Sequence, residues 1–431
     1  MTTEIRDLVA RQVWDSRGRP TIEVEIALSG GARGRAIAPS GASTGKREAL
    51  DRRDGGKRFG GYGVDRALAD LRSEVAPGLG GMDAGDQRAI DARLIALDGT
   101  PQKTRLGGNA IVATSLAVAW AAAASAGVPL WQHVRDLAGL SGEPVMPLPM
   151  IQIFGGGRHA GRRIDVQDFL VLCPGASRFA EAVEWTAEIY MAAADVMQRK
   201  GHLSGVADEG GLWPDFASNE EGLDRLMEAI RLAGFTPGGE VGIALDIAAS
   251  SFFENGRYRL GLEGRTLDTD GLIEMLCRWA SAFPILSLED PVAEDDDEGF
   301  VEITRRLGDT VQIVGDDYLV SDAASIRRAA ERGACNSVLL KVNQCGTVSE
   351  LIAASAAARR SNWNTIQSGR SGESEDVALS HLAVGLMSDQ IKVGSMARSE
   401  RTAKWNEAIR IEEAVGGRMW RFKVPGRWGG A

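Results

Sequence analysis

The sequence has few cysteines, and none of them is arranged as a metal site or a disulfide framework. The four cysteines, Cys173, Cys277, Cys335 and Cys345, lie far apart and form no Cys-x-x-Cys pair. Disulfide-rich secreted domains need many closely spaced cysteines, and structural zinc sites use paired ones. The pattern therefore excludes both classes and favours a reducing compartment, so we expect a cytoplasmic protein.

The sequence also lacks an excess of basic residues and a secretion signal. Its formal net charge is −10, which argues against a general nucleic-acid or anionic-membrane surface. A small cationic pocket is still compatible with an acidic chain, so we expect a small anionic molecule as the partner. The N-terminus, MTTEIRDLVARQVW, has no basic start followed by an apolar block, and therefore predicts no signal peptide.

Long runs without charge are rare. The one clear case extends from Ala110 to Trp131 and consists mostly of alanine interrupted by Ser and Thr. Alanine transfers into lipid less favourably than Leu or Ile does. The run therefore predicts a buried helix and no membrane span.

The pattern of apolar and polar residues changes once along the 431 residues, which indicates two domains. Residues 11–40 alternate apolar and polar side chains, as an antiparallel meander does, and residues 64–131 have the pattern of helices broken by Gly and Pro. After residue 142, short apolar runs alternate with helical segments, which is typical of βα units. We predict an α+β domain over residues 1–140 and an α/β barrel of the TIM type over residues 141–431.

Successive apolar runs in the second part each end in an ionisable residue. These residues are Asp246, Glu289, Asp316, Lys341, Arg370 and Lys392. From Glu289 onward the steps are 22–29 residues long, which is enough for a strand, a helix and two loops. Each residue alone has the ordinary explanation of a strand-end charge that faces water. Six of them in register predict three carboxylates and three cations around the C-terminal mouth of one barrel.

Three carboxylates that converge on one point repel one another unless a cation neutralises them. All-oxygen ligation selects a hard ion such as Mg²⁺, so we predict that Asp246, Glu289 and Asp316 bind it. Two lysines that face the same metal should have lowered pKa values and provide a base near neutral pH. The glycine-rich turn TIQSGRSGESED adds Arg370 and Ser371, which are suited to hold an anion.

The chain resembles the enolase family over nearly its whole length. The resemblance rests on segments that occur in the family's order: DSRGRPTIEVE (15–25), PSGASTG (39–45), GGRHAG (156–161), DEGG (208–211), LDIAAS (245–250), LED (288–290), VGDD (314–317), LLKVNQ (339–344), RSGE (370–373) and IKVGSMARSER (391–401). It implies an enolase-type barrel behind an α+β capping domain, and a homodimer or a dimer-based higher oligomer.

The resemblance also implies roles for individual residues. Lys341 resembles the base that removes the C2 proton, Lys392 the cation that helps to stabilise the resulting dianion, and Glu209 the acid that protonates the departing hydroxyl. His159 resembles a loop histidine that closes over the substrate. Arg370 and Ser371 resemble the phosphate clamp, and Ser43 resembles a ligand of a second Mg²⁺ that arrives with the substrate.

The same comparison shows departures around the site. Gly369 stands where the family has histidine, and Asp168, a candidate catalytic residue, stands where it has glutamate. The loop around His159 adds Arg158, Arg162 and Arg163, which we expect to contact an anionic substrate. Further replacements are Gln152, Gly155, Trp213 and Gln367.

Three functions stay open on this evidence. The first is a Mg²⁺-dependent dehydratase that acts on 2-phosphoglycerate or on a larger phosphorylated or phosphonylated carboxylate. The second is an enzyme similar to the carboxyphosphonoenolpyruvate synthases of phosphonate and phosphinate biosynthesis. The third is a non-catalytic binding protein of enolase-like fold, against which the retained metal, base and acid positions argue.

Overall fold

The N-terminal part of the chain forms an antiparallel meander covered by helices. The computed structural model describes residues 2–42, 44–199, 201, 205–416 and 418–419. Three strands pair in the order β1–β2–β3, namely β1 (Ile5–Trp14), β2 (Pro20–Leu28) and β3 (Arg33–Ile37). The alternating pattern that predicted this meander arises because one face of such a sheet is buried. Ser43, a predicted metal and substrate ligand, lies outside the described residues.

Five α-helices follow this sheet. They are α1 (Asp65–Asp70), α2 (Ala76–Leu79), α3 (Gln87–Asp98), α4 (Gly108–Ala126) and α5 (Leu130–Leu137). The alanine-rich helix α4 packs on β2 and β3 and is buried along most of its length. A Cβ atom at Gly34 of β3 would lie 2.1 Å from the backbone nitrogen of Ala121. This close approach requires glycine in the strand and small residues on the helix.

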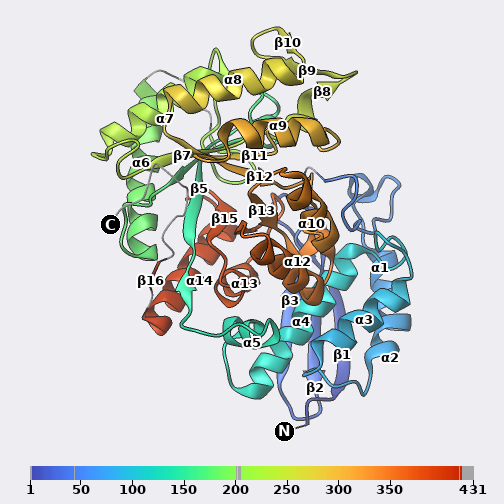
Figure 1. Ribbon diagram of the computed structural model, residues 1–431. Helices are drawn as coiled ribbons and strands as arrows, with labels where there is room; N and C mark the ends of the chain where they lie inside the picture. The colour runs from blue at the N-terminus through green and yellow to red at the C-terminus, as the bar shows by residue number, and fades with distance from the viewer. Residues whose placement is uncertain (1, 43, 200, 202–204, 417, 420–431) are drawn as a thin grey trace.

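The C-terminal part is a closed eight-stranded barrel. Its strands are β5 (Leu148–Gly155), β6 (Asp168–Leu172), β7 (Gly242–Asp246), β11 (Ile285–Glu289), β12 (Gln312–Gly315), β13 (Ser337–Leu340), β14 (Asn364–Ser368) and β15 (Gln390–Gly394). The predicted fold class, an α/β barrel behind an α+β domain, is confirmed. Figure 1 shows the N-terminal domain, blue to cyan, beside the barrel helices α10 and α12.

The first barrel connection departs from the predicted alternation of strands and helices. Strand β6 pairs antiparallel with both β5 and β7, and only a short 3₁₀ turn, η3 (Gly157–Ala160), separates β5 from β6. The connecting segment GGRHAGRRIDVQ has no apolar periodicity with which a helix could cover the barrel. Without a crossover helix the next strand runs antiparallel. The start of β6, at Asp168, therefore lies at the same mouth as the ends of the parallel strands.

Helices surround the barrel. They are α6 (Phe179–Arg199), α7 (Asn219–Leu232), α8 (Thr269–Ala282), α9 (Asp297–Leu307), α10 (Ala323–Arg332), α12 (Val348–Arg360), α13 (Ala378–Gly385) and α14 (Ser399–Val415), with a single turn α11 (Val342–Cys345) after β13. Side chains cap several of them, and the Asp296 carboxylate accepts from Gly299 N at 2.9 Å at the start of α9. The acidic run EDDDEG, residues 294–299, therefore lies at the start of this helix.

The remaining described strands are short. They are β4 (Val145–Met146), which pairs with β16 (Arg418–Met419), and the three-stranded sheet of β8 (Phe253–Glu254), β9 (Arg257–Leu260) and β10 (Arg265–Leu267).

Nine buried apolar residues fill the barrel interior. They are Leu148, Met150, Leu170, Leu172, Ala244, Leu286, Val314, Leu339 and Ile366, all contributed by barrel strands. Side chains that point inward from every strand of a barrel meet in such layers, so the interior is a packed core and no pore. Chemistry is thereby confined to the mouth.

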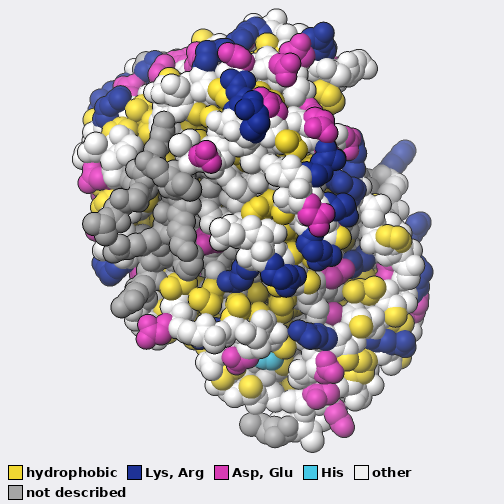
Figure 2. Space-filling view, in the orientation of Figure 1, with side chains coloured by type: hydrophobic (Ala, Val, Ile, Leu, Met, Phe, Trp, Pro, Cys, Tyr) yellow, Lys and Arg dark blue, Asp and Glu magenta, His cyan; other side chains and the backbone are white. Residues whose placement is uncertain are grey.

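The surface mixes charges of both signs. On the face shown in Figure 2, basic and acidic side chains are interspersed. Ion pairs such as Arg332 with Glu298 (2.6 Å) join charges of the two signs. Among the described residues, α4 alone is long and apolar enough to cross a membrane by length and composition. However, 78% of its most apolar window is buried inside the protein, as in the core helix of a soluble protein.

Candidate active site

The ionisable residues predicted at strand ends lie together at one end of the barrel. Asp246 and Glu289 are the last residues of β7 and β11, and Asp316 directly follows β12. Lys341 directly follows β13, and Lys392 lies within β15. All five are at most 9% exposed. Parallel strands that end at one mouth bring these charges together out of water.

The ammonium group of Lys392 joins the first two carboxylates. Its Nζ lies 2.8 Å from both oxygens of Glu289, 2.9 Å from Oδ2 of Asp246 and 3.6 Å from Oδ2 of Asp168. Burial alone would lower the pKa of Lys392, but Asp246 and then Glu289 outweigh burial and raise it well above its usual range. Lys392 is therefore a fixed cation in this arrangement.

Lys341 is paired with the third carboxylate. Its Nζ donates to Oδ2 of Asp316 at 2.5 Å, and the side-chain amide of Gln344 donates to the other oxygen at 2.9 Å. Burial lowers the pKa of Lys341, but Asp316 outweighs burial and raises it. We expected a bound cation to lower the pKa values of both lysines. Without such a cation, the neighbouring carboxylates raise both pKa values.

The three predicted ligands do not converge on a single point. In the described part of the chain, two sets of at least three possible ligand atoms lie within 4.8 Å of one another: His159 with Asp168 and Glu209, and Asp290 with Asp316 and Asp317. Asp246 and Glu289 meet at Lys392, whereas Asp316 faces Lys341. Their joint role as metal ligands stays a prediction.

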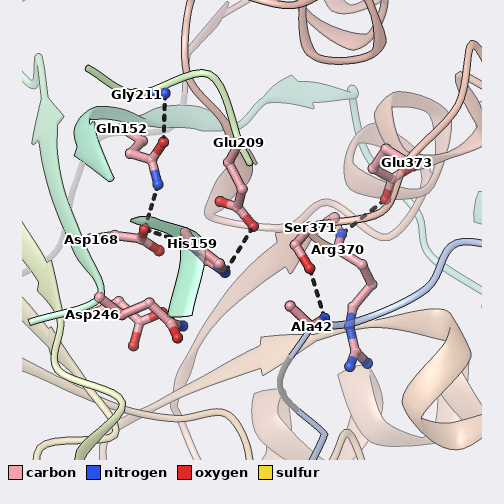
Figure 3. A network of polar contacts seen from close by, with 12 residues as sticks. Ala42, Gln152, His159, Asp168, Glu209, Gly211, Asp246, Arg370, Ser371 and Glu373 are labelled. Carbon is pink, nitrogen blue, oxygen red and sulfur yellow. Dashed lines mark hydrogen bonds and ion pairs between the residues drawn. The ribbon is translucent and has the colours of Figure 1, made fainter. Parts of the chain in front are cut away.

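A chain of polar contacts extends from Asp168, which lies beside Lys392, to Glu209 (Figure 3). His159 Nδ1 lies 3.1 Å from Oδ1 of Asp168, and its Nε2 lies 3.7 Å from Oε1 of Glu209. Burial of the imidazole lowers the pKa of His159, but Glu209 and Asp168 outweigh burial and raise the pKa to about 9. The imidazole is therefore protonated at neutral pH and bridges two carboxylates.

Gln152 holds Asp168 in place. Its amide nitrogen donates to Oδ1 of Asp168, and its amide oxygen accepts from the backbone nitrogen of Gly211 at 2.8 Å. The other oxygen of Asp168, Oδ2, is buried without a hydrogen-bond partner. Gln152 is one of the departures from the family pattern, and it supports the contact between Asp168 and His159.

The predicted anion turn follows β14. Ser371 Oγ accepts from the backbone nitrogen of Ala42 at 2.7 Å (Figure 3) and from Arg17 at 3.3 Å. The guanidinium of Arg370 donates to both oxygens of Glu48 at 3.2 Å. Burial lowers the pKa of Arg370, but Glu48 outweighs burial and raises it. The clamp is thus assembled by the N-terminal domain, which provides Glu48 and Ala42.

The three loop arginines, Arg158, Arg162 and Arg163, are exposed on the loop that carries His159. Cζ of Arg163 lies 5.8 Å from the centre of the Trp213 ring. None of the three lines the pocket described next. Their contact with a substrate stays a prediction.

A polar pocket with about 350 Å³ of empty space, its opening included, lies at the mouth. Of the predicted residues, those in its lining are His159, Asp168, Glu209, Asp246, Lys341, Gly369, Arg370, Ser371 and Lys392. Glu289 and Asp316 lie behind the lysines. The pocket therefore brings three carboxylates together with His159 and three basic side chains, as in a site for a small polar molecule.

Two contributors were not anticipated from the sequence. Gln167 donates to Oδ2 of Asp246 at 3.1 Å, and Glu48 pairs with Arg370. Gln167 directly precedes Asp168, the first residue of β6. Its position next to a predicted site residue is the one feature of the sequence that could have indicated its role. Glu48 is 322 residues from its partner along the chain, and no spacing pattern reports that contact.

The fold and this site define a class of barrel enzymes in which buried carboxylates and lysines share one mouth. Two family profiles match the chain, "Enolase, N-terminal domain" over residues 5–134 and "Enolase, C-terminal TIM barrel domain" over residues 143–422. The chain is also 48% identical to "Enolase 1" of Desulfitobacterium hafniense (strain Y51) over 416 residues, which cover 96% of this chain and 94% of the relative. The chain belongs to the enolase family and is an enolase-type carbon–oxygen lyase.

Proposed function

We propose that the protein removes the proton α to a carboxylate and eliminates the β-hydroxyl group of its substrate. The substrate is 2-phosphoglycerate, which gives phosphoenolpyruvate, or a larger phosphorylated or phosphonylated analogue. The observation that carries this proposal is the pocket in which Lys341, Glu209 and Arg370 line the same small volume. A base, an acid and an anion clamp are the three groups that such an elimination requires.

Lys341 acts as the base in this proposal. It follows β13 and lines the pocket, and its Nζ is held by Asp316. The amine must be neutral to accept the C2 proton, whereas Asp316 stabilises the charged ammonium. A cation that binds Asp316 in place of the ammonium would therefore lower the pKa of Lys341 and favour the reaction. Lys392, fixed between Asp246 and Glu289, stays charged and stabilises the dianion that forms on the substrate carboxylate.

The three carboxylates are the proposed ligands of a divalent cation, which would compete with Lys392 for Asp246 and Glu289 and with Lys341 for Asp316. Burial and the neighbouring Asp246 raise the pKa of Glu289 well above its usual range, because Lys392 does not neutralise all the carboxylates around it. Asp246, Glu289 and Asp316 would hold one Mg²⁺, and Ser43 and the substrate phosphate would help to hold a second. Bound there, Mg²⁺ supplies positive charge to the carboxylate oxygens of the substrate.

Glu209 acts as the acid that protonates the departing hydroxyl. His159 lies 3.7 Å from it and is itself held by Asp168. A protonated imidazole at this distance provides the positive charge that keeps an adjacent carboxylate in place, and Asp168 orients the ring. The shorter side chain of aspartate at this position sets how far His159 reaches into the pocket.

A second candidate is a function similar to that of the carboxyphosphonoenolpyruvate synthases. The observation that favours it is Gly369, which leaves the pocket wall beside the anion clamp without a side chain. The third candidate, a non-catalytic binding protein, is set aside because the chain belongs to a family of lyases and retains the base and the acid.

The proposal also covers the oligomeric state and the cellular compartment of the protein. We expect a homodimer or a dimer-based higher oligomer in the cytoplasm, with no nucleic acid and no membrane as partner. Trp14 is 52% exposed and stacks edge to face on the half-exposed Phe59 at 5.3 Å. Such an exposed aromatic pair is consistent with a surface that another subunit covers.

The test separates proton abstraction from elimination. With 2-phosphoglycerate and Mg²⁺ in deuterium oxide, Lys341→Ala should stop exchange of the C2 hydrogen by at least about 100-fold. Glu209→Gln should retain exchange and block product formation, because abstraction precedes loss of the hydroxyl. Exposed Lys57→Ala and Glu413→Gln serve as matched controls that keep both activities. Exchange that persists in Lys341→Ala would remove this lysine from the role of base.

A further inference from the structure

A second cavity lies between the N-terminal domain and the barrel, where Figure 1 shows the helices α10 and α12 beside the N-terminal domain. Its volume is about 320 Å³, which is within the range of small-molecule sites. Exposed residues from both sides, among them Arg47 and Arg328, line it, so it opens to solvent. None of its lining residues lines the pocket of the candidate active site. We call this space the interdomain cleft.

Two arginines of the interdomain cleft have donors to spare. Arg47 donates to the backbone oxygen of Tyr318 at 2.7 Å, and Arg328 donates to Oγ of Ser325 at 2.9 Å. Both acceptors are uncharged, and within the described part of the chain neither guanidinium forms an ion pair with a carboxylate. A guanidinium carries five N–H donors. Each arginine can therefore bind an anionic group without giving up a charged partner.

The two acids that line the interdomain cleft are already engaged by the protein. Glu350 pairs with Lys103, which is 5% exposed, at 2.9 Å, and its other oxygen accepts from Oγ1 of Thr347 at 2.8 Å. Asp322 accepts from the backbone nitrogen of Ser325 at 2.7 Å at the start of α10, where the helix dipole is positive. The cleft thus presents two guanidiniums whose charge its own acids do not neutralise.

Two side chains form the wall between the interdomain cleft and the candidate active site. Oγ of Ser321 donates to Oε1 of Gln344 at 2.7 Å and accepts from the backbone nitrogen of Lys341 at 2.8 Å. Nε2 of Gln344 donates to Oδ1 of Asp316 at 2.9 Å. Ser321 and Gln344 line the cleft, whereas Lys341 lines the pocket. The cleft is therefore a separate space behind the catalytic residues and no extension of the pocket.

We propose that the interdomain cleft is a second binding site, which takes a small anion with two phosphoryl or carboxylate groups. Arg47 and Arg328 bind the two acidic groups from opposite domains, since charge-assisted pairs between guanidinium and phosphate or carboxylate are among the strongest hydrogen bonds in proteins. The ligand of this site is not the substrate, because the proposed base and acid, Lys341 and Glu209, line the pocket and not the cleft.

The experiment measures binding of pyrophosphate by calorimetry to the full chain. Mg²⁺ is left out, because pyrophosphate itself binds this ion. The variants are Arg47→Gln and Arg328→Gln, each of which removes one guanidinium, and Asp322→Asn, which removes a negative charge and keeps a side chain that can cap α10. The matched control is Arg327→Gln, which removes the same charge from an exposed position of α10 that does not line the cleft.

Arg47→Gln and Arg328→Gln should each weaken pyrophosphate binding by about tenfold or more, because each removes a charged hydrogen-bond donor. Arg327→Gln should change the affinity by less than about threefold, since charges outside the cleft are screened. Asp322→Asn should tighten binding by about threefold or more, because a like charge leaves the site. Equal effects of Arg328→Gln and Arg327→Gln, or an affinity that Arg47→Gln does not change, would overturn the second site.

The pocket is the other place where pyrophosphate could bind. Arg370→Gln, a change in the anion turn, should leave the affinity within about threefold of the native value, because Arg370 does not line the interdomain cleft. Ser371→Ala replaces that variant if thermal unfolding shows that it does not fold. Binding that is lost in the anion-turn variant and retained in Arg328→Gln would locate pyrophosphate in the pocket and reject the second site. Absence of binding to the native protein at millimolar pyrophosphate would also reject it.

Discussion

Lys392 places its ammonium nitrogen 2.8 Å from both carboxylate oxygens of Glu289. The same nitrogen lies 2.9 Å from Oδ2 of Asp246, so one cation holds two buried carboxylates at the end of neighbouring strands. Asp316 is held in the same way by Lys341. Each lysine therefore keeps a carboxylate oriented toward the mouth, where a divalent cation would compete with the ammonium for the same oxygens.

The metal prediction concerns Asp316. Replacement by Asn conserves the shape of the side chain and removes its charge, so Asp316→Asn should weaken Mg²⁺ binding by more than about 100-fold and abolish turnover. The fold should persist, because residues at the mouth of a barrel contribute more to function than to packing. Calorimetry with Mg²⁺ and thermal unfolding provide the measurement, with the exposed Asp309→Asn as control. Unchanged Mg²⁺ affinity in Asp316→Asn would refute the assignment.

The raised pKa of His159 predicts a pH-dependent stability. Its pKa is 6.5 in the unfolded chain and about 9 in the folded protein, where Glu209, Asp168 and the more distant Asp246 face it. The contribution to folding is therefore complete below pH 6.5 and lost as the pH rises through 9. It amounts to about 3 kcal/mol. Urea unfolding of the native protein and His159→Gln, both in chelator, should show their difference in stability shrink over that range.

His133 provides a control of opposite sign. Burial lowers its pKa below 6.5, so protonation of the unfolded chain costs stability as the pH falls through that value. The native protein should therefore lose stability relative to His133→Gln at acidic pH, with no difference in slope above pH 6.5. A His159→Gln difference that does not vary between pH 6.5 and 9 would show that the imidazole is neutral in the folded protein.

Gly369 and Asp168 predict a change in substrate preference. Gly369→His with Asp168→Glu restores the residues of the family pattern, so turnover of 2-phosphoglycerate should rise by about tenfold or more as the carboxylate regains its reach. The new Cβ atom lies 3.1 Å from Oε1 of Glu373, which must yield by a few tenths of an ångström. Steady-state kinetics tests this prediction. A native kcat for 2-phosphoglycerate already on the order of 10 s⁻¹ would show that the departures are neutral.

Arg401 predicts a link between stability and anion binding. It is 0% exposed, and its guanidinium donates to the backbone oxygens of Arg370, Ser371 and Val393. Arg401→Met should destabilise the fold by roughly 3–5 kcal/mol and raise KM more than it lowers kcat, because the orphaned carbonyls belong to the anion turn. Denaturant unfolding and kinetics provide the check. Arg410→Met, on the same helix with a side chain 65% exposed, should change stability by less than about 0.5 kcal/mol.

Periodic patterns predicted most of the architecture. Alternation over residues 11–40 predicted the meander, and the regular recurrence of strand-end charges predicted the barrel, because both patterns follow directly from which face of an element is buried. The antiparallel β6 was missed. Its direction depends on whether the segment before it forms a crossover helix, and that segment is too short and too polar to carry a periodic signal.

The site was only partly predictable for a related reason. Lys341 and Lys392 were assigned from their places after apolar runs, and the structure confirms that they lie at one mouth. Their partners were not assigned, because the choice of Lys392 for Asp246 and Glu289, and of Lys341 for Asp316, depends on side-chain directions across the barrel. The place of the loop arginines was likewise beyond sequence patterns, since exposure of a long side chain in a glycine-rich loop depends on how the loop folds back.

The sequence by itself determined the class of fold, the strand ends that carry charge, and the family, because each depends on residues that are adjacent or regularly spaced along the chain. Only the tertiary structure decided that Glu48 of the N-terminal domain pairs with Arg370, that His159 bridges Asp168 and Glu209, and that Arg47 and Arg328 line one cleft. These features join segments that are distant in sequence, and their energies come from burial and charge pairing that exist only once the chain has folded.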